Sequence, residues 1–457
     1  MSALPTRIET EAGHLLTPLE IFDIAANRET NLSRLLMLYI STGLVFMLLP
    51  GTFLGVWNLL AISSHRAANS VSPAWIQAHG HAQIFGWIGT FILGIGFYSI
   101  PKLRRLNAFA LSAVWLSWAL WTSGTALRWL TSVYLWHWRA LLPVSGALEL
   151  AAFAIFLRSI SGHRPQDRGK GRLEEWVLVV VAGSVGFLTT LLVNFGVALF
   201  LSLRAASPSL PPEFDQRFLV LETWGFLVPF VWGFSAKWLP IFLGLRPIHG
   251  RILLLGIGLN SVGVLTALAG RTVPAAFLLL VGVITYVYSL RLFEPSERSA
   301  KVKGVHASFP VFVRLAYAWA VVAASLGIWA ALAANSQGIW GASRHALTVG
   351  FLAMMVFAIG QRVLPAFSGM RILFSTKLMF IALVLLTAGC ALRVSSEILA
   401  YRNLAPSAWT WLPVSAITEM AAVTVFAVNL LVTFARRPPS TMSAYRSGEG
   451  PMAPIQS

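Results

Sequence analysis

Two histidine-bearing segments, far apart in the chain, have residue types and spacing that could hold a metal-containing cofactor. The run His79-Gly-His81-Ala-Gln-Ile-Phe-Gly-Trp87 opens one apolar stretch, and His345-Ala-Leu-Thr-Val-Gly350 opens another. Neutral imidazole is a common metal ligand, and ionisable groups at membrane depth are costly and usually functional. If His81 and His345 lie at equal depth, they could hold a flat, apolar haem from its two faces. For each histidine alone, an interfacial hydrogen-bonding role is the alternative.

His79 is a separate candidate, because two residues along a helix turn its side chain about 200° away from His81. It is therefore expected either to bind a second metal or to face water. The candidate metal ligands are His79, His81 and His345, with haem as the expected cofactor and copper as a further option. The single cysteine, Cys390, excludes structural disulfides and cysteine-based zinc or iron–sulfur sites.

Two arginines and two glutamates accompany the histidines. Arg128 and Arg393 are expected near the outer ends of their helices, where a guanidinium could pair with the propionates of a haem or contact lipid phosphate. Glu149 and Glu419 fall close to mid-membrane and are each expected to be neutral or paired. They fit a structural role or a proton path equally well.

These residues recur in an internal repeat. His81 and the following Pro101 match His345 and Pro365 at the same spacing. In the same order, Gly124-Thr-Ala-Leu-Arg128 matches Gly389-Cys-Ala-Leu-Arg393, and Leu142-Pro-Val-Ser145 with Glu149 matches Leu412-Pro-Val-Ser415 with Glu419. A fainter middle copy contains Trp224-Gly-Phe226 and Pro240, with Val220 in place of the histidine. The pattern predicts three units of four helices each.

The composition shows where these helices lie. Of the 457 residues, 57% are hydrophobic and only 11% are charged, which excludes disorder and nucleic-acid binding and indicates a membrane protein. A membrane span needs about 20 apolar residues. Twelve spans are predicted, at 35–60, 79–101, 107–130, 140–158, 176–203, 218–240, 252–270, 273–291, 314–334, 345–365, 378–396 and 411–435.

The expected organisation is an all-α integral membrane protein with one twelve-span domain over 34–437. Its repeat units are about 34–160, 175–293 and 311–437, preceded by a cytoplasmic segment 1–33 and followed by a disordered cytoplasmic tail 438–457. The net charge of +17 arises from 34 basic and 17 acidic residues, and most of the basic ones fall in alternate loops. By the positive-inside rule, both termini are predicted on the inner side of the membrane, and this membrane is expected to be a bacterial inner membrane.

This pattern resembles subunit I of the haem-copper oxidases and nitric oxide reductases. In that superfamily, spans 2 and 10 supply the axial ligands of the low-spin haem, so the resemblance implies His81 and His345 as those ligands. The superfamily's copper-B centre takes histidines from spans 6 and 7, where this chain has none, His249 being the nearest. The position of its high-spin haem ligand is Ser343. The resemblance therefore implies an oxidase-like subunit without the binuclear centre.

The segment His345-Ala-Leu-Thr-Val-Gly350 also resembles the NnrS family of haem- and copper-containing membrane proteins, which are tied to nitric oxide metabolism and nitrosative stress. The first motif differs, with His81-Ala-Gln where that family has a His-Glu-Met-like sequence. The resemblance implies a haem protein that handles nitric oxide. The alternatives are an electron-transfer subunit with a redox partner protein or quinol, and a membrane transporter, although three units do not match the usual two-halved transporter.

Overall fold

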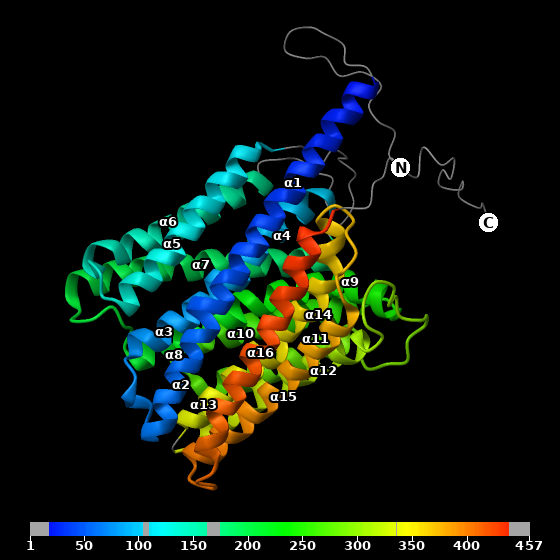
Figure 1. Ribbon diagram of the computed structural model, residues 1–457. Coiled ribbons are helices and arrows are strands. Elements are labelled where there is room, and N and C mark those ends of the chain that lie inside the picture. Colours follow the sequence, from blue (N-terminus) through cyan, green and yellow to red (C-terminus); the bar gives the residue numbers. More distant parts are fainter. Residues whose placement is uncertain (1–17, 104–108, 162–173, 335, 438–457) are drawn as a thin grey trace.

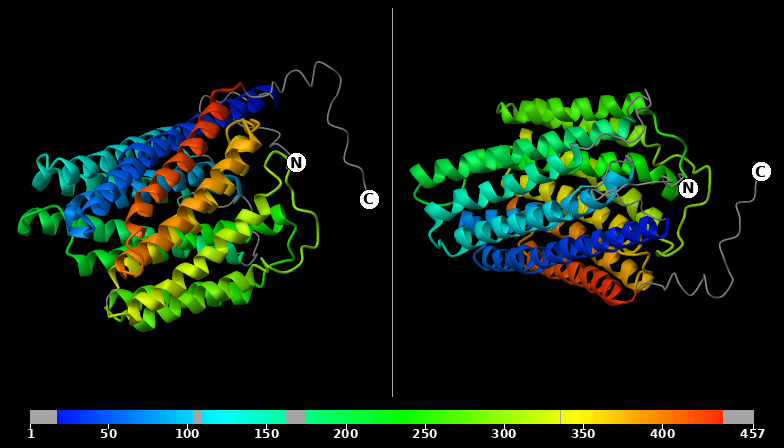
Figure 2. Two further views of the ribbon diagram at one scale, coloured as in Figure 1. Left: turned by 60° about the horizontal axis from the view of Figure 1, so that its bottom comes forward. Right: turned by 90° about the horizontal axis from the view of Figure 1, so that it is seen from above.

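The computed structural model describes residues 18–103, 109–161, 174–334 and 336–437, and the described chain is all-helical without strands. The predicted tail 438–457 and most of the N-terminal segment 1–33 lie outside the described residues. The long helices run roughly side by side in one bundle (Figures 1 and 2). Helix α1 begins at Pro18, well before the predicted start of the first span, and α16 ends at Ala435 at the same end of the bundle.

The helices fall into the three predicted units. The first holds α1 (Pro18–Phe46), η1 (Met47–Phe53), α2 (Leu54–His65), η2 (Ala68–Ser70), α3 (Pro73–His81), η3 (Ala82–Gly89), α4 (Thr90–Leu103), α5 (Leu111–Val133) and α6 (Trp138–Ser161). The second holds α7 (Glu175–Arg204), α8 (Pro212–Val220), η4 (Leu221–Leu227), α9 (Val228–Leu243), α10 (Gly250–Leu268) and α11 (Thr272–Ser289). The third holds α12 (Phe309–Leu332), α13 (Gln337–His345), η5 (Ala346–Ala353), α14 (Met354–Phe367), α15 (Thr376–Tyr401) and α16 (Ala408–Ala435).

Eleven helical segments of the described chain are long and apolar enough to cross a membrane. The predicted third span corresponds to α5, whose tryptophans, serines and threonines lower its mean hydropathy. Its 23 residues make a helix of about 34 Å, long enough to cross the bilayer, and it packs along α6 inside the bundle. Helix α5 therefore brings the number of spans to the predicted twelve through its length and its place in the fold, and not through its apolarity.

Short π-helical segments interrupt the equivalent helix of each unit. Segments η3, η4 and η5 follow directly after His81, Val220 and His345, the three residues that the repeat aligns. A π-helical turn holds one residue more than an α-helical turn and is frequent at functional sites. The equivalent placement of these segments supports the repeat that the sequence predicts.

A fourth π-helical segment, η1, contains Pro50, which has no N–H to donate to the preceding turn.

Helix packing elsewhere depends on small residues. Gly186 of α7 lies so close to η4 that a Cβ there would be 1.8 Å from the carbonyl oxygen of Gly225. This close approach fixes the middle unit's central helix against α7.

Candidate functional site

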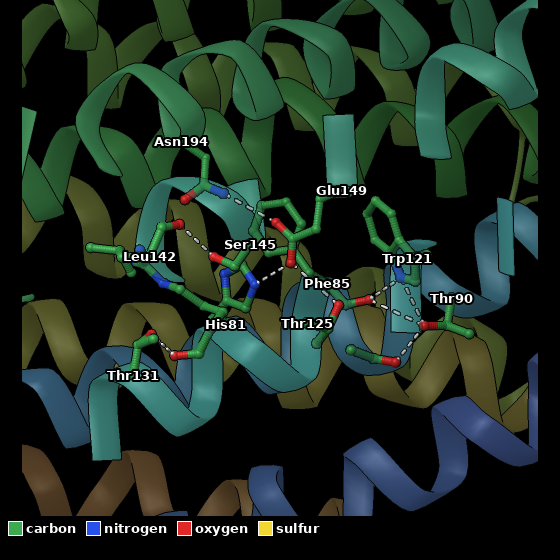
Figure 3. A network of polar contacts seen from close by, with 12 residues as sticks. His81, Phe85, Thr90, Trp121, Thr125, Thr131, Leu142, Ser145, Glu149 and Asn194 are labelled. Carbon is green, nitrogen blue, oxygen red and sulfur yellow. Dashed lines mark hydrogen bonds and ion pairs between the residues drawn. The ribbon is translucent and has the colours of Figure 1, made fainter. Parts of the chain in front are cut away.

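His81 lies in a buried polar cluster of the first unit and does not face His345. Its Nε2 lies 2.7 Å from Oε1 of Glu149, the glutamate of the first repeat unit that the sequence predicts to be neutral or paired. Glu149 is fully buried and accepts further hydrogen bonds from Thr125 Oγ1 at 3.3 Å and Asn194 Nδ2 at 3.1 Å (Figure 3). The ring of Phe85 stacks on the imidazole, with centroids 4.4 Å apart. A carboxylate can only accept, so Nε2 carries the proton and the lone pair of a neutral His81 ring lies on Nδ1.

His79 points to a different part of the bundle. Its Nδ1 donates a 2.8 Å hydrogen bond to the carbonyl oxygen of Gly51, in the π-helical turn around Pro50. A carbonyl can only accept, so Nδ1 carries the proton, and the neutral ring keeps its lone pair on Nε2. The ring rests on Gly55 of α2, where a Cβ would lie 2.6 Å from it. His79 is thus held at one nitrogen and leaves the other available.

His345 has the same chemical form. Its Nδ1 donates to the carbonyl of Gly341, one turn earlier in α13, at 3.0 Å. The lone pair of the neutral ring is again on Nε2, for which the described chain shows no partner. About 27% of the His345 side chain stays accessible, so packing does not enclose the ring. His79, His345 and Arg393 lie close enough for their charges, when present, to act on one another, so we treat these three side chains as one group.

Arg393 and two carboxylates complete this group, which we call the α13–α15 cluster after the helices that carry His345, Arg393 and Glu397. Its other members are His79 from α3 and Glu419 from α16. The Glu397 carboxylate lies 3.5 Å from His345 Nδ1 and 3.4 Å from Arg393 Nη2, too far for strong hydrogen bonds. Four buried side-chain atoms of the cluster have no hydrogen-bond partner in the described chain: Nε and Nη1 of Arg393, Oε2 of Glu397 and Oε1 of Glu419.

The two repeat-related clusters therefore differ in how well their polar groups are satisfied. In the first unit, His81, Glu149 and Asn194 bond to one another, and none of their side-chain atoms is left buried without a partner in the described chain. In the third unit, the equivalents of the same histidine and glutamate, His345 and Glu419, do not pair. Leaving buried donors and acceptors unpaired costs about 1–3 kcal/mol each, so such atoms in a native fold need an explanation.

Arg128, the repeat equivalent of Arg393, belongs to the first cluster. It is 6% exposed and interacts electrostatically with Glu149, Glu222 and Asp215. It lies on α5 and does not join the α13–α15 cluster. Of the two arginines predicted as partners of haem propionates, only Arg393 lies in one cluster with His345. The predicted pairing of His81 with His345 stays a prediction, and the histidine that lies close enough to act electrostatically on His345 is His79.

The ligand set suits haem better than a bare metal ion. Within the described residues, no group of three or more His, Cys, Asp and Glu side chains is arranged to hold a metal ion. Copper and zinc sites need three or four protein ligands, whereas a haem supplies four nitrogens of its own and needs only two axial ligands. The free Nε2 atoms of His79 and His345, with the unpaired donors of Arg393 for a propionate, fit a haem.

The middle unit lacks the corresponding imidazoles, as the sequence predicts. Val220 ends α8 where the other units have histidine, and His249 lies at the start of α10, stacked on Tyr288. Ser343 donates its hydroxyl to the carbonyl of Ala323 at 2.8 Å and so takes a packing role.

Sequence reasoning missed Glu397. It pairs His81 with His345, whereas the structure groups His79 with His345, and the identity of the partner stays a prediction. The signal for Glu397 was its place four residues after Arg393, on the same face of α15. The sequence signal for the position of His79 was Gly55 together with Pro50. A glycine and a turn widened by proline leave room for the imidazole ring of His79 against α2. Both signals depend on which helix lies opposite, and the sequence does not show this.

Comparison with known proteins supports the fold. A family model described as a domain of unknown function (DUF8744) matches residues 243–435. No curated protein matches the chain in sequence. One similar solved structure is described as "Cryo-EM structure of a heme-copper terminal oxidase dimer provides insights into its catalytic mechanism". The chain is 11% identical to it, with a TM-score of 0.51 over 89% of this chain and 85% of that one. The chain therefore has the helical fold of a haem-copper oxidase subunit.

Proposed function

We propose that this chain is a membrane haem protein that binds one haem between α3 and α13, with His79 and His345 as the axial ligands, and uses it for electron transfer. The observation that carries the proposal is the α13–α15 cluster. Two imidazoles there keep free Nε2 lone pairs beside buried, unpaired Arg393 donors. In the repeat-related cluster of His81, Glu149 and Asn194, the side chains bond to one another instead. We further propose that the protein spans a bacterial inner membrane with both termini inside.

The chain's own residues would prepare the site. Gly51 and Gly341 fix the Nδ1–H tautomers, so each ring presents Nε2 without reorganisation. Arg393 would neutralise a propionate, and Glu397 would balance the remaining positive charge. Haem, when bound, supplies a one-electron iron couple. Two histidine ligands from the chain would favour electron transfer by the haem over binding of a gas.

The electron partner is proposed to be a quinol or a redox protein. The motif His345-Ala-Leu-Thr-Val-Gly350 further supports an NnrS-like role for this electron transfer in the response to nitric oxide or nitrosative stress. Growth of a deletion strain under nitric oxide donors tests that role. Complementation by the wild-type gene but not by His79→Ala is expected, and equal protection by both would overturn it.

Optical spectra of the detergent-purified protein test the haem proposal. Oxidised and reduced spectra of the wild type should show a Soret band, with sharp α and β bands on reduction. We expect His79→Ala and His345→Ala to lose these bands and His81→Ala to keep them, because His81 lies in the separate cluster around Glu149. Loss in His81→Ala with retention in His79→Ala would instead identify His81 as the ligand. Absence of a Soret band after expression with ample haem would refute haem binding and favour transport, which solute uptake by vesicles would then test.

A further inference from the structure

A basic pocket lies at the opposite end of the central helices from the histidines, where α9 and α14 end. It has a volume of about 420 Å³. Three cationic side chains line it, namely Lys303, Arg362 and Arg371, together with the aromatic rings of Trp238, Phe242 and Phe367. Among the described residues that line it, none is a carboxylate. A concave site with three cations and no counter-charge points to an anionic ligand.

Two of these cations are held in place by contacts that leave donors free. Arg362 donates one Nη1 hydrogen bond to the Lys303 carbonyl, and its guanidinium lies 5.2 Å from the Phe242 ring centroid. Arg371 donates from Nε to the carbonyl of Arg436 at 3.0 Å. A guanidinium has five N–H donors in a fork that matches phosphate oxygens, so each retains several for a ligand. The Lys303 side chain makes no polar contact with the described chain.

The surroundings of the pocket are those of a membrane border. Met370 and Ile372, beside Arg371 in the segment after α14, are each 71% exposed and give the rim of the pocket an apolar surface. Trp238 and Phe367 pack at 6.2 Å and form an aromatic wall. Aromatic rings and basic residues gather where spanning helices meet headgroups, and basic pockets between such helices bind anionic lipid headgroups.

We infer that this pocket binds the phosphate headgroup of an anionic phospholipid, with the acyl chains lying along the exposed apolar side chains next to Arg371. The phosphate would lie between Lys303, Arg362 and Arg371. A volume of about 420 Å³ is within the roughly 300–1,000 Å³ range of small-ligand sites and suits a phosphate with its glycerol. The inference does not depend on haem binding.

Native mass spectrometry of the full detergent-purified chain tests this site. The protein is titrated with phosphatidylglycerol or with phosphatidylcholine of the same acyl chains, and bound lipid is counted by mass. We expect tighter binding of phosphatidylglycerol, weakened roughly fivefold by each of Lys303→Gln and Arg362→Gln. Lys377→Gln, which removes an exposed cation at the same end outside the pocket, is the matched control and should bind as the wild type does.

Three results would overturn the inference. Equal affinity for the two lipids would exclude charge recognition, and an equal loss in Lys377→Gln would show only a general effect of net charge. Binding of glycerol phosphate as tightly as of phosphatidylglycerol would show a soluble anion as the ligand. Because the Lys303 side chain makes no polar contact in the described chain, Lys303→Gln should fold normally and keeps the test valid if Arg362→Gln does not.

Discussion

The contact between Gly55 and His79 offers a test of the site that leaves every candidate ligand in place. A Cβ at Gly55 would lie 2.6 Å from Cε1 of the imidazole, whereas carbon atoms in normal contact are about 3.5 Å apart. In Gly55→Ala the ring must therefore move by roughly 0.9 Å. Sites of this kind tolerate displacements of about 0.5 Å, so we expect haem affinity to fall by about 10- to 100-fold, the loss typical of disturbed ligand support.

Haem titration of the purified apoprotein, followed by the Soret band, measures this affinity. Gly80→Ala is the matched control, because a Cβ at Gly80 meets nothing within 4 Å although this residue lies between the two histidines of α3. We expect Gly80→Ala to bind haem as the wild type does. Unchanged binding by Gly55→Ala would refute His79 as a ligand, since no other candidate ligand contacts Gly55.

Three further predictions concern the fold around the site. Glu149→Ala leaves a buried imidazole and amide unpaired, at about 1–3 kcal/mol each, so unfolding should cost roughly 2–6 kcal/mol less, and a thermal midpoint close to wild type would contradict this. Gly186→Ala should lower the melting temperature in detergent by forcing α7 from η4, while Gly196→Ala, with open space at its Cβ, should not. The hydrogen bond from Lys237 lowers the pKa of Glu174, so its small stabilisation, at most about 1 kcal/mol, should be present near neutral pH and lost as the pH falls through that lowered pKa. The melting temperatures of wild type and Glu174→Gln should then converge in acid, and a constant difference would exclude this ion pair as the cause.

The sequence predicts the helices well because apolar length and repeated motifs report directly on membrane crossing. Eleven predicted spans have matching apolar helices, and α5 shows why the repeat adds information that hydropathy lacks. Helix α1 begins before the predicted first span, because the polar residues after Pro18 continue the helix beyond its apolar part. Helix formation there depends on backbone hydrogen bonding and not on apolarity.

The site is only partly predictable. The sequence identifies His345 and Arg393 by their repeat, and the structure brings both into one cluster. It cannot decide between His79 and His81, because that choice depends on the rotation of α3 and on which helix offers Glu149 or Gly55 as a neighbour. Symmetry of the repeat argues for His81, whereas the packing of α2 against α3 favours His79.

The π-helical segments after His81, Val220 and His345 also indicate how the repeat evolved. Each extra residue is an insertion in a helix, and three independent insertions at one aligned position are improbable. One insertion in a single four-helix ancestor, followed by two rounds of copying and fusion, accounts for all three. Each copy of the unit therefore carries the widened turn at the same level of its central helix, directly after the aligned residue.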